Sequence, residues 1–375
     1  MTPRIVYLAT ADARGHLMRA QLLVHALRQA GAHVEVLTTS AAGQSFLAGF
    51  GIASTILSRH YAVQFDTRQN MLRAATNRNV AHYMFHPARM LRDVVRLQRI
   101  LRGAHLLVND SFHPAVLFMG AMPFWRRKVV HVYGVSLRRA LVANFDGNRP
   151  GLFSRLLSGL FKRVVDWQID TARACFEHDF AYELTQADGR AHQRLPTPVA
   201  LAGSLHGAAA DGAAVYLNPH FRDTRLADAL CAGIADAGLT AHRVGEGYAR
   251  RSGWRGVDAD WASRAAHAQV IVSAPGMAAL SIALVYARPI VLVLTDQPEQ
   301  ASNAARVAQL GIAHRVVTWR GDADDFRHQV AQAVTALNAG GQSLPHVASG
   351  RIQAQARVDA WTGRLLALCS GQAAA

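Results

Sequence analysis

The sequence predicts an α/β protein in which parallel sheets form two domains. Short apolar runs typical of buried strands alternate along the chain with longer segments whose apolar residues recur at helical spacing. A strand that follows a crossover helix returns in the same direction, so this order predicts parallel pairing. A chain of 375 residues is also long enough to bury two separate cores.

The opening segment predicts a strand–helix–strand unit. Residues 5–9 form an apolar run, residues 17–27 show helical spacing before Gly31, and residues 34–37 form the next apolar run. The loop at residues 11–16 therefore follows the first strand directly. Ligands of open α/β sheets bind at this carboxyl-end edge, which makes the loop a candidate site.

We expect the domain boundary within residues 195–212, which are rich in Pro, Gly and Ala and show no clear period. Beyond it the alternation resumes. The predicted elements there are strands at 213–217 and 241–244, a helix at 226–237 and a helix at 324–338. We therefore predict domains at residues 1–200 and 201–350, followed by a terminal helix and tail at 351–375.

The composition is that of a globular protein, with 51% hydrophobic and 17% charged residues. The formal net charge of +15 comes almost wholly from arginine, since Lys128 and Lys162 are the only lysines. A basic surface favours anionic partners such as nucleotide sugars, acidic polymers or phospholipid head groups. Nucleic acid is less favoured, because the basic stretches lack the aromatic pattern of a nucleic-acid module.

The cysteines and the apolar runs indicate a cytoplasmic protein. Cys175, Cys231 and Cys369 lie far apart and are odd in number, which argues against a disulfide framework or a zinc site. The first strand begins at once and leaves no room for a signal peptide. No apolar run approaches the roughly 20 residues that span a bilayer. Membrane contact would therefore be peripheral, at the inner face.

Two segments are candidates for such contact, residues 83–103 and 151–167, because both combine helical apolar spacing with basic side chains. In the first, most of the apolar side chains are expected to point inward and the arginines outward. The expected inward residues are Met90, Leu91, Val94, Val95, Leu97 and Leu101. The alternative for both segments is an ordinary core-facing helix with a solvated side.

The stretch at residues 270–304 holds two short apolar runs, each followed by a turn-forming cluster and a helical pattern. Two strands would thus end at the same edge of a sheet. The helix that follows each strand offers free backbone N–H groups to an anion there. The alternative is a helix N-terminus that binds nothing.

This stretch resembles the donor-sugar region of the two-domain GT-B glycosyltransferases. The matching residues, in order, are Gly276, Ala283-Leu284, Pro289, Glu299-Gln300 and Asn303-Ala304. Two positions depart: the phosphate-binding His of the family falls at Ala274, and its ribose-binding Glu falls at Ile282. The resemblance implies two Rossmann-like domains that face a central cleft. It also implies inverting, metal-independent transfer of a sugar from a nucleotide sugar, with UDP the expected nucleotide and no cofactor.

The donor-binding residues that we predict lie in the loops of both halves. They are Gly15, Ser273, Pro275, Gly276, Met277, Glu299, Gln300 and Asn303. The acceptor stays open between a lipid-linked molecule, a polysaccharide and a small molecule. In this fold the polar segment at 61–78 would lie near the acceptor.

His16 is the predicted catalytic base. It follows the first strand, and an imidazole can accept a proton near neutral pH. Gly15-His16 also resembles the opening of the GT-B transferases, while Gly15, His16 and Arg19 together match the nucleotide-sugar hydrolase of the pseudaminic acid pathway. The alternative is a His that packs or caps the loop.

Asp110 is the predicted partner of His16, because the apolar run at 106–108 places it at a strand end on the same edge. A carboxylate on the second ring nitrogen would fix the tautomer and stabilise the imidazolium. The alternative is a helix N-cap. Three functions stay open: a glycosyltransferase, a nucleotide-sugar hydrolase, and a binding protein that kept the fold without the chemistry.

Overall fold

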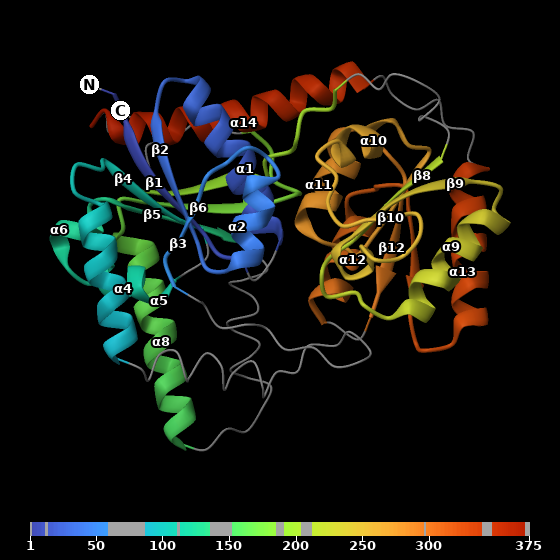
Figure 1. Cartoon of the computed structure of the whole chain (residues 1–375), viewed down its shortest axis with the longest axis horizontal. Helices are drawn as coiled ribbons and strands as arrows, with labels where there is room; N and C mark the ends of the chain where they lie inside the picture. Colours follow the sequence, from blue (N-terminus) through green and yellow to red (C-terminus); the bar gives the residue numbers. More distant parts are fainter. Residues whose placement is uncertain are drawn as a thin grey trace. The chain divides into compact units, whose positions relative to one another are not determined.

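The computed structural model describes residues 2–11, 14–58, 87–110, 113–135, 152–184, 191–203, 212–295, 298–339 and 347–371. The described residues divide into two compact units, drawn in Figure 1. The division falls between Thr197 and Pro198. The terminal helix α14 (Val347–Cys369) contributes to both units, with residues from Arg357 onward belonging to the first. The segment at 61–78 lies outside the described residues.

The first unit contains a seven-stranded sheet in the order β3-β2-β1-β4-β5-β6-β7, and every pairing is parallel. The strands are β1 (Arg4–Ala9), β2 (His33–Thr38), β3 (Thr55–Ile56), β4 (Leu106–Asp110), β5 (Val129–Gly134), β6 (Ala174–Asp179) and β7 (His192–Pro196). This sheet confirms the predicted α/β class.

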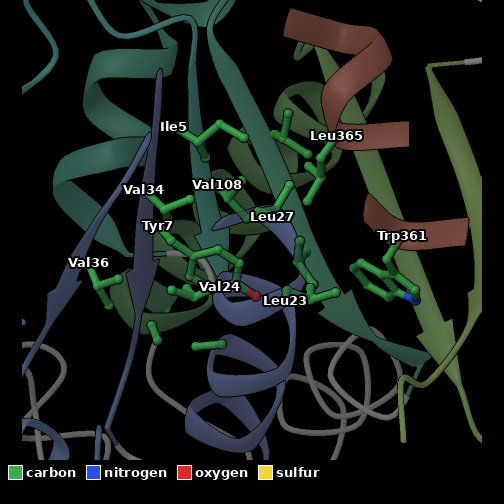
Figure 2. Packing of buried hydrophobic residues seen from close by; sticks show 14 of the residues in the cluster. Ile5, Tyr7, Leu23, Val24, Leu27, Val34, Val36, Val108, Trp361 and Leu365 are labelled. Atoms are coloured by element: carbon green, nitrogen blue, oxygen red, sulfur yellow. The ribbon is translucent and has the colours of Figure 1, made fainter. Parts of the chain in front are cut away.

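Helices α1 (Arg14–Gln29) and α14 pack on one face of this sheet, and α2 (Ala41–Ala48) adjoins them. Figure 2 shows side chains of α1, of the central strands and of α14 meeting in one cluster. The labelled members are Ile5, Tyr7, Leu23, Val24, Leu27, Val34, Val36, Val108, Trp361 and Leu365. The indole of Trp361 donates a hydrogen bond to the Pro196 carbonyl at 2.9 Å, so the buried ring also satisfies its polar atom.

Helices α4 (Pro87–Ile100), α5 (Pro114–Gly120), α6 (Pro123–Arg126) and α8 (Leu152–Thr171) belong to the opposite layer. Val94 and Leu97 of α4 are buried against the sheet, as predicted. Leu91 and Val95 are exposed, so the prediction that they face inward was wrong. At 100° per residue they lie beside the buried stripe of α4, and its other flank carries the buried Asp93.

The second unit contains a six-stranded parallel sheet in the order β10-β9-β8-β11-β12-β13. The strands are β8 (Gly212–Leu217), β9 (Thr240–Gly245), β10 (Trp254–Arg255), β11 (Val270–Ser273), β12 (Ile290–Leu294) and β13 (His314–Thr318). Helices α9 (Thr224–Asp236) and α13 (Ala323–Asn338) bury their apolar sides against it. Three further helices are α10 (Trp261–His267), α11 (Met277–Val285) and α12 (Pro298–Gln309).

The buried His131 of β5 forms contacts with β4 and with α8. The amide nitrogen of Asn109 donates to Nδ1 of His131 at 3.1 Å, and Nε2 lies 3.4 Å from the Gln168 Oε1. An amide nitrogen can only donate, so Nδ1 accepts and the ring is neutral with its hydrogen on Nε2. Burial lowers the pKa of His131 from 6.5 to about 4.

This histidine predicts acid sensitivity. Between about pH 6.5 and pH 4 the unfolded chain binds a proton at His131 that the folded chain does not, so stability falls as the pH falls through this window. At about 1.4 kcal/mol per pKa unit, the loss approaches roughly 3 kcal/mol. Across this pH range, the free energy of unfolding, measured with urea, should fall less steeply with falling pH in His131→Gln than in the unchanged protein. The control is His328→Gln, whose side chain is exposed. If the stability of His131→Gln falls with pH as steeply as that of this control, the prediction is wrong.

Candidate active site

Three strands of the first unit direct polar side chains toward α1. Side chains alternate along a strand, and the register pairs Tyr7 with Val108 and Ala9 with Asp110. Tyr7 and Asp110 therefore point to the same face of the sheet, and His178 of β6 points there too by the register of β5 and β6. All three side chains are buried.

Helix α1 brings two more groups to this place, His16 and Arg19, one helical turn apart. The His16 Nδ1 lies 2.7 Å from Oδ1 of Asp110. The Arg19 Nε donates to Oδ2 of Asp110 at 2.8 Å, and the Nη2 of Arg19 donates to Oδ1. The Tyr7 hydroxyl donates to Oδ2 at 2.8 Å. Both oxygens of a fully buried carboxylate thus receive charged or polar donors.

The ionisation of Asp110 fixes the tautomer of His16. Burial by itself would raise the pKa of the Asp110 carboxyl, but Arg19 and His16 outweigh burial and hold it well below its usual range. An ionised carboxylate only accepts hydrogen bonds, so Nδ1 of His16 carries a hydrogen, and in this tautomer of the neutral ring Nε2 has the lone pair. The Nη2 of Arg19, 3.0 Å from Nδ1, is then a close neighbour rather than a hydrogen-bond donor to the ring.

His16 is the exposed member of this cluster. Its side chain retains 20% exposure, whereas Asp110 retains none and Arg19 retains 4%. The structure therefore presents an imidazole at the carboxyl-end edge of the sheet, with one nitrogen held by a carboxylate. Such a group can accept a proton from a bound hydroxyl or water.

The guanidinium balances the carboxylate. Burial would lower the pKa of Arg19, but the contact with Asp110 raises it, so the side chain stays charged. His178 contributes no charge, because burial lowers its pKa well below the ordinary value and the nearby Arg19 adds to that effect. Arg19 and Asp110 carry opposite charges that cancel each other.

His16 and Asp110 were predicted from the sequence, whereas Tyr7, Arg19 and His178 had no predicted role. The strand alternation contains the signal for Tyr7, because the register of the two neighbouring strands puts Tyr7 on the same face of the sheet as Asp110, two residues away from it along the strand direction. His178 lies on β6, more than sixty residues after Asp110 along the chain, and no local sequence pattern connects it with His16.

In the second unit, several predicted donor-binding side chains hold the loops themselves. The Ser273 hydroxyl donates to the Tyr216 carbonyl at 2.9 Å. The Asn303 amide donates to the Pro275 carbonyl at 2.9 Å. The Gln300 Oε1 accepts from the backbone N–H of Thr295 at 2.7 Å. Gln300 and Asn303 of α12 thus fix the two loops that follow β11 and β12, and all of these side chains are buried.

Gly276 is exposed and Met277 is half-buried, so they are the more accessible part of this region. Gly276 precedes α11 and provides no side-chain cap for the first amides of the helix, and its own N–H donates to the Ala274 carbonyl at 2.7 Å. Ala274 and Ile282, the two departures from the transferase pattern, are buried apolar residues. The Glu299 side chain lies outside the described residues. In the first unit, Gly15 is exposed, with no atom within 4 Å of the position a Cβ would take.

Metal-binding side chains do not gather in the described ranges, which contain no group of three or more that could hold an ion. No protein-family model matches this sequence, and no curated protein matches it.

Solved structures do resemble the whole chain. The calicheamicin glycosyltransferase CalG4 matches with a TM-score of 0.60 at 16% identity, over 100% of this chain and 98% of the other. The spinosyn rhamnosyltransferase SpnG, complexed with thymidine diphosphate, matches with a TM-score of 0.57 at 16% identity, over 97% and 99%. LpCGTa, in complex with UDP, matches with a TM-score of 0.57 at 15% identity, over 100% of both chains.

The chain has the GT-B fold. This confirms the predicted architecture of two Rossmann-like domains. In this GT-B chain each unit has its own candidate site at the carboxyl ends of its strands. The His16–Asp110 pair occupies the first unit, and the Gly276–Met277 backbone occupies the second.

Proposed function

We propose that this chain is an inverting, metal-independent glycosyltransferase that moves a sugar from a nucleotide sugar to an acceptor hydroxyl. The contact between His16 and Asp110 at 2.7 Å carries this proposal. It presents a partly exposed imidazole whose second nitrogen is held by an ionised carboxylate. The resemblance of the whole chain to glycosyltransferases supports it, through the fold that they share.

In the proposed reaction, Nε2 of His16 removes the proton of the acceptor hydroxyl as its oxygen attacks the anomeric carbon. The new carbon–oxygen bond forms while the bond to the phosphate oxygen breaks, and the nucleoside diphosphate leaves with the electron pair. Asp110 stabilises the imidazolium that forms. A positioned general base of this kind contributes typically about 10²–10⁴-fold in rate.

The donor diphosphate is assigned to the N-terminus of α11. The amides of the first helical turn, beginning with Met277, and the helix dipole favour a negative charge there without a metal, whereas the Gly276 N–H is bonded to the Ala274 carbonyl. Gln300 and Asn303 act indirectly, because they fix the loops that present these amides. The nucleotide is expected to be UDP or thymidine diphosphate, since LpCGTa and SpnG carry these ligands.

A nucleotide-sugar hydrolase is the second candidate, and one observation favours it. The Arg19 of the Gly-His-x-x-Arg pattern lies within the cluster and contacts both His16 and Asp110. In that reaction His16 would activate water instead of an acceptor hydroxyl.

Ligand-induced stabilisation is the test of donor binding. UDP and thymidine diphosphate, each with a panel of their sugars, are expected to raise the melting temperature of the protein by mass action. The ligand that stabilises most is then incubated with the enzyme, with and without hydroxyl acceptors. Nucleotide release that requires an acceptor supports transfer. Release of free sugar without one supports the hydrolase, and binding without release contradicts both.

A further inference from the structure

The helical layer of the first unit opposite α1 carries a concentration of exposed apolar side chains. Five of the eleven exposed large hydrophobic residues described belong to its four helices. They are Leu91 and Val95 of α4, Phe118 of α5, Phe124 of α6 and Trp167 of α8. We call this the α4–α8 face. Figure 1 shows these helices together on one side of the sheet.

Cationic side chains stand directly against the exposed rings. The Arg126 guanidinium lies 4.9 Å from the centre of the Trp167 ring. The Lys128 ammonium lies 5.7 Å from the ring of Phe124 and 5.9 Å from that of Trp125. Phe124 is 67% exposed, so this ring stands out from the surface instead of filling the core. Aromatic and positive groups are thus interleaved at one place.

The charge of the α4–α8 face is strongly positive. The basic residues among the described side chains of its helices and adjoining turns are Arg89, Arg92, Arg96, Arg99, Arg102, Arg126, Arg127, Lys128, Arg163 and Arg173. The acidic residues among the described side chains of these segments are Asp93, Asp166 and Asp170, and Asp93 is buried. The residues next to the apolar side chains therefore attract an anionic surface.

We infer that the α4–α8 face docks on an anionic phospholipid bilayer. Rings such as Phe124 and Trp167 can enter the interfacial layer while their neighbouring cations pair with head-group phosphates. Each such cation strengthens the attraction to an anionic surface. A folded protein partner would instead favour one deep apolar pocket, whereas here the apolar groups are spread over four helices among cations.

The place of this face within the unit leaves the candidate active site open. Helix α6 and the end of α8 lead into the first residues of β5 and β6. Phe124 and Trp167 therefore lie toward the edge where strands begin, and His16 lies at the edge where strands end. Within this unit, docking through these rings does not cover the imidazole. No helix among the described residues is both long and apolar enough to cross a bilayer, so the contact is peripheral.

Vesicle sedimentation tests the inference. The full chain is expected to bind phosphatidylcholine vesicles that contain phosphatidylglycerol, to ignore pure phosphatidylcholine, and to be released by salt. The double variant Phe124→Ser, Trp167→Ser should bind about tenfold more weakly, and Arg126→Gln with Lys128→Gln should lose a similar factor. Both variants must melt near the temperature of the unchanged protein to count.

The matched control is Ile352→Ser with Arg250→Gln, since both side chains are exposed and belong to the second unit. It should bind as the unchanged protein does. Binding that survives both α4–α8 variants, or that ignores phosphatidylglycerol, would overturn the inference. So would tighter, variant-sensitive binding to RNA or heparin than to vesicles. None of these results depends on sugar transfer.

Discussion

Replacing His16 by alanine is expected to abolish transfer while nucleotide binding persists. The imidazole is the proposed proton acceptor, and its loss removes about 10²–10⁴-fold in rate. The donor loops belong to the second unit, so their amides are unchanged. Product formation is measured with the hydroxyl acceptor that supports nucleotide release in the incubation test, and donor binding is measured by the shift in melting temperature.

The control is His33→Ala, because His33 is exposed on β2 and has no place in the cluster. It should retain full rate. Asp110→Asn is expected to lower the rate as well, since an amide can present a hydrogen to Nδ1 and so favour the wrong tautomer. Transfer at the normal rate by His16→Ala would exclude His16 as the base. The assignment of the GT-B fold would not change.

The second large effect is on stability. Replacing Arg19 by methionine is expected to lower the free energy of unfolding by about 3–5 kcal/mol at neutral pH. Arg19 is buried and bonded to both oxygens of Asp110, which would be left as a buried charge without its counter-ion. The double variant Arg19→Met, Asp110→Leu removes both charges and should recover much of the loss. Urea unfolding of the single and double variants measures this coupling.

The pH dependence gives an independent check. In the unchanged protein, folding lowers the pKa of Asp110. The ionised carboxylate therefore stabilises the folded chain at every pH above the pKa of the unfolded chain. This stability is lost only as the pH falls through the pKa of the folded chain. In Arg19→Met burial dominates and raises the pKa of Asp110, so protonation relieves the cost as the pH falls. The gap between the two proteins should therefore narrow on acidification. If the free energies of unfolding of the unchanged protein and of Arg19→Met differ by less than about 1 kcal/mol at neutral pH, the ion pair is not required for stability.

Periodicity by itself predicted most of the architecture. The alternation of apolar runs and helical patterns predicted two parallel sheets, and it placed His16 after the first strand and Asp110 at the end of a later one. These predictions succeed because the side of an element that is buried shows directly in its own residue spacing. The pairing of His16 with Asp110 followed from the rule that parallel strands end at one edge.

The sequence determined which residues stand at strand ends; the tertiary structure decided what each of them touches. Arg19 proved to be the counter-ion of Asp110, and Leu91 and Val95 proved to be exposed. Ser273 and Asn303 bond to the backbone of their own unit. The physical reason is that spacing reports the side of one element, whereas a contact depends on strand order, register and helix packing between distant segments.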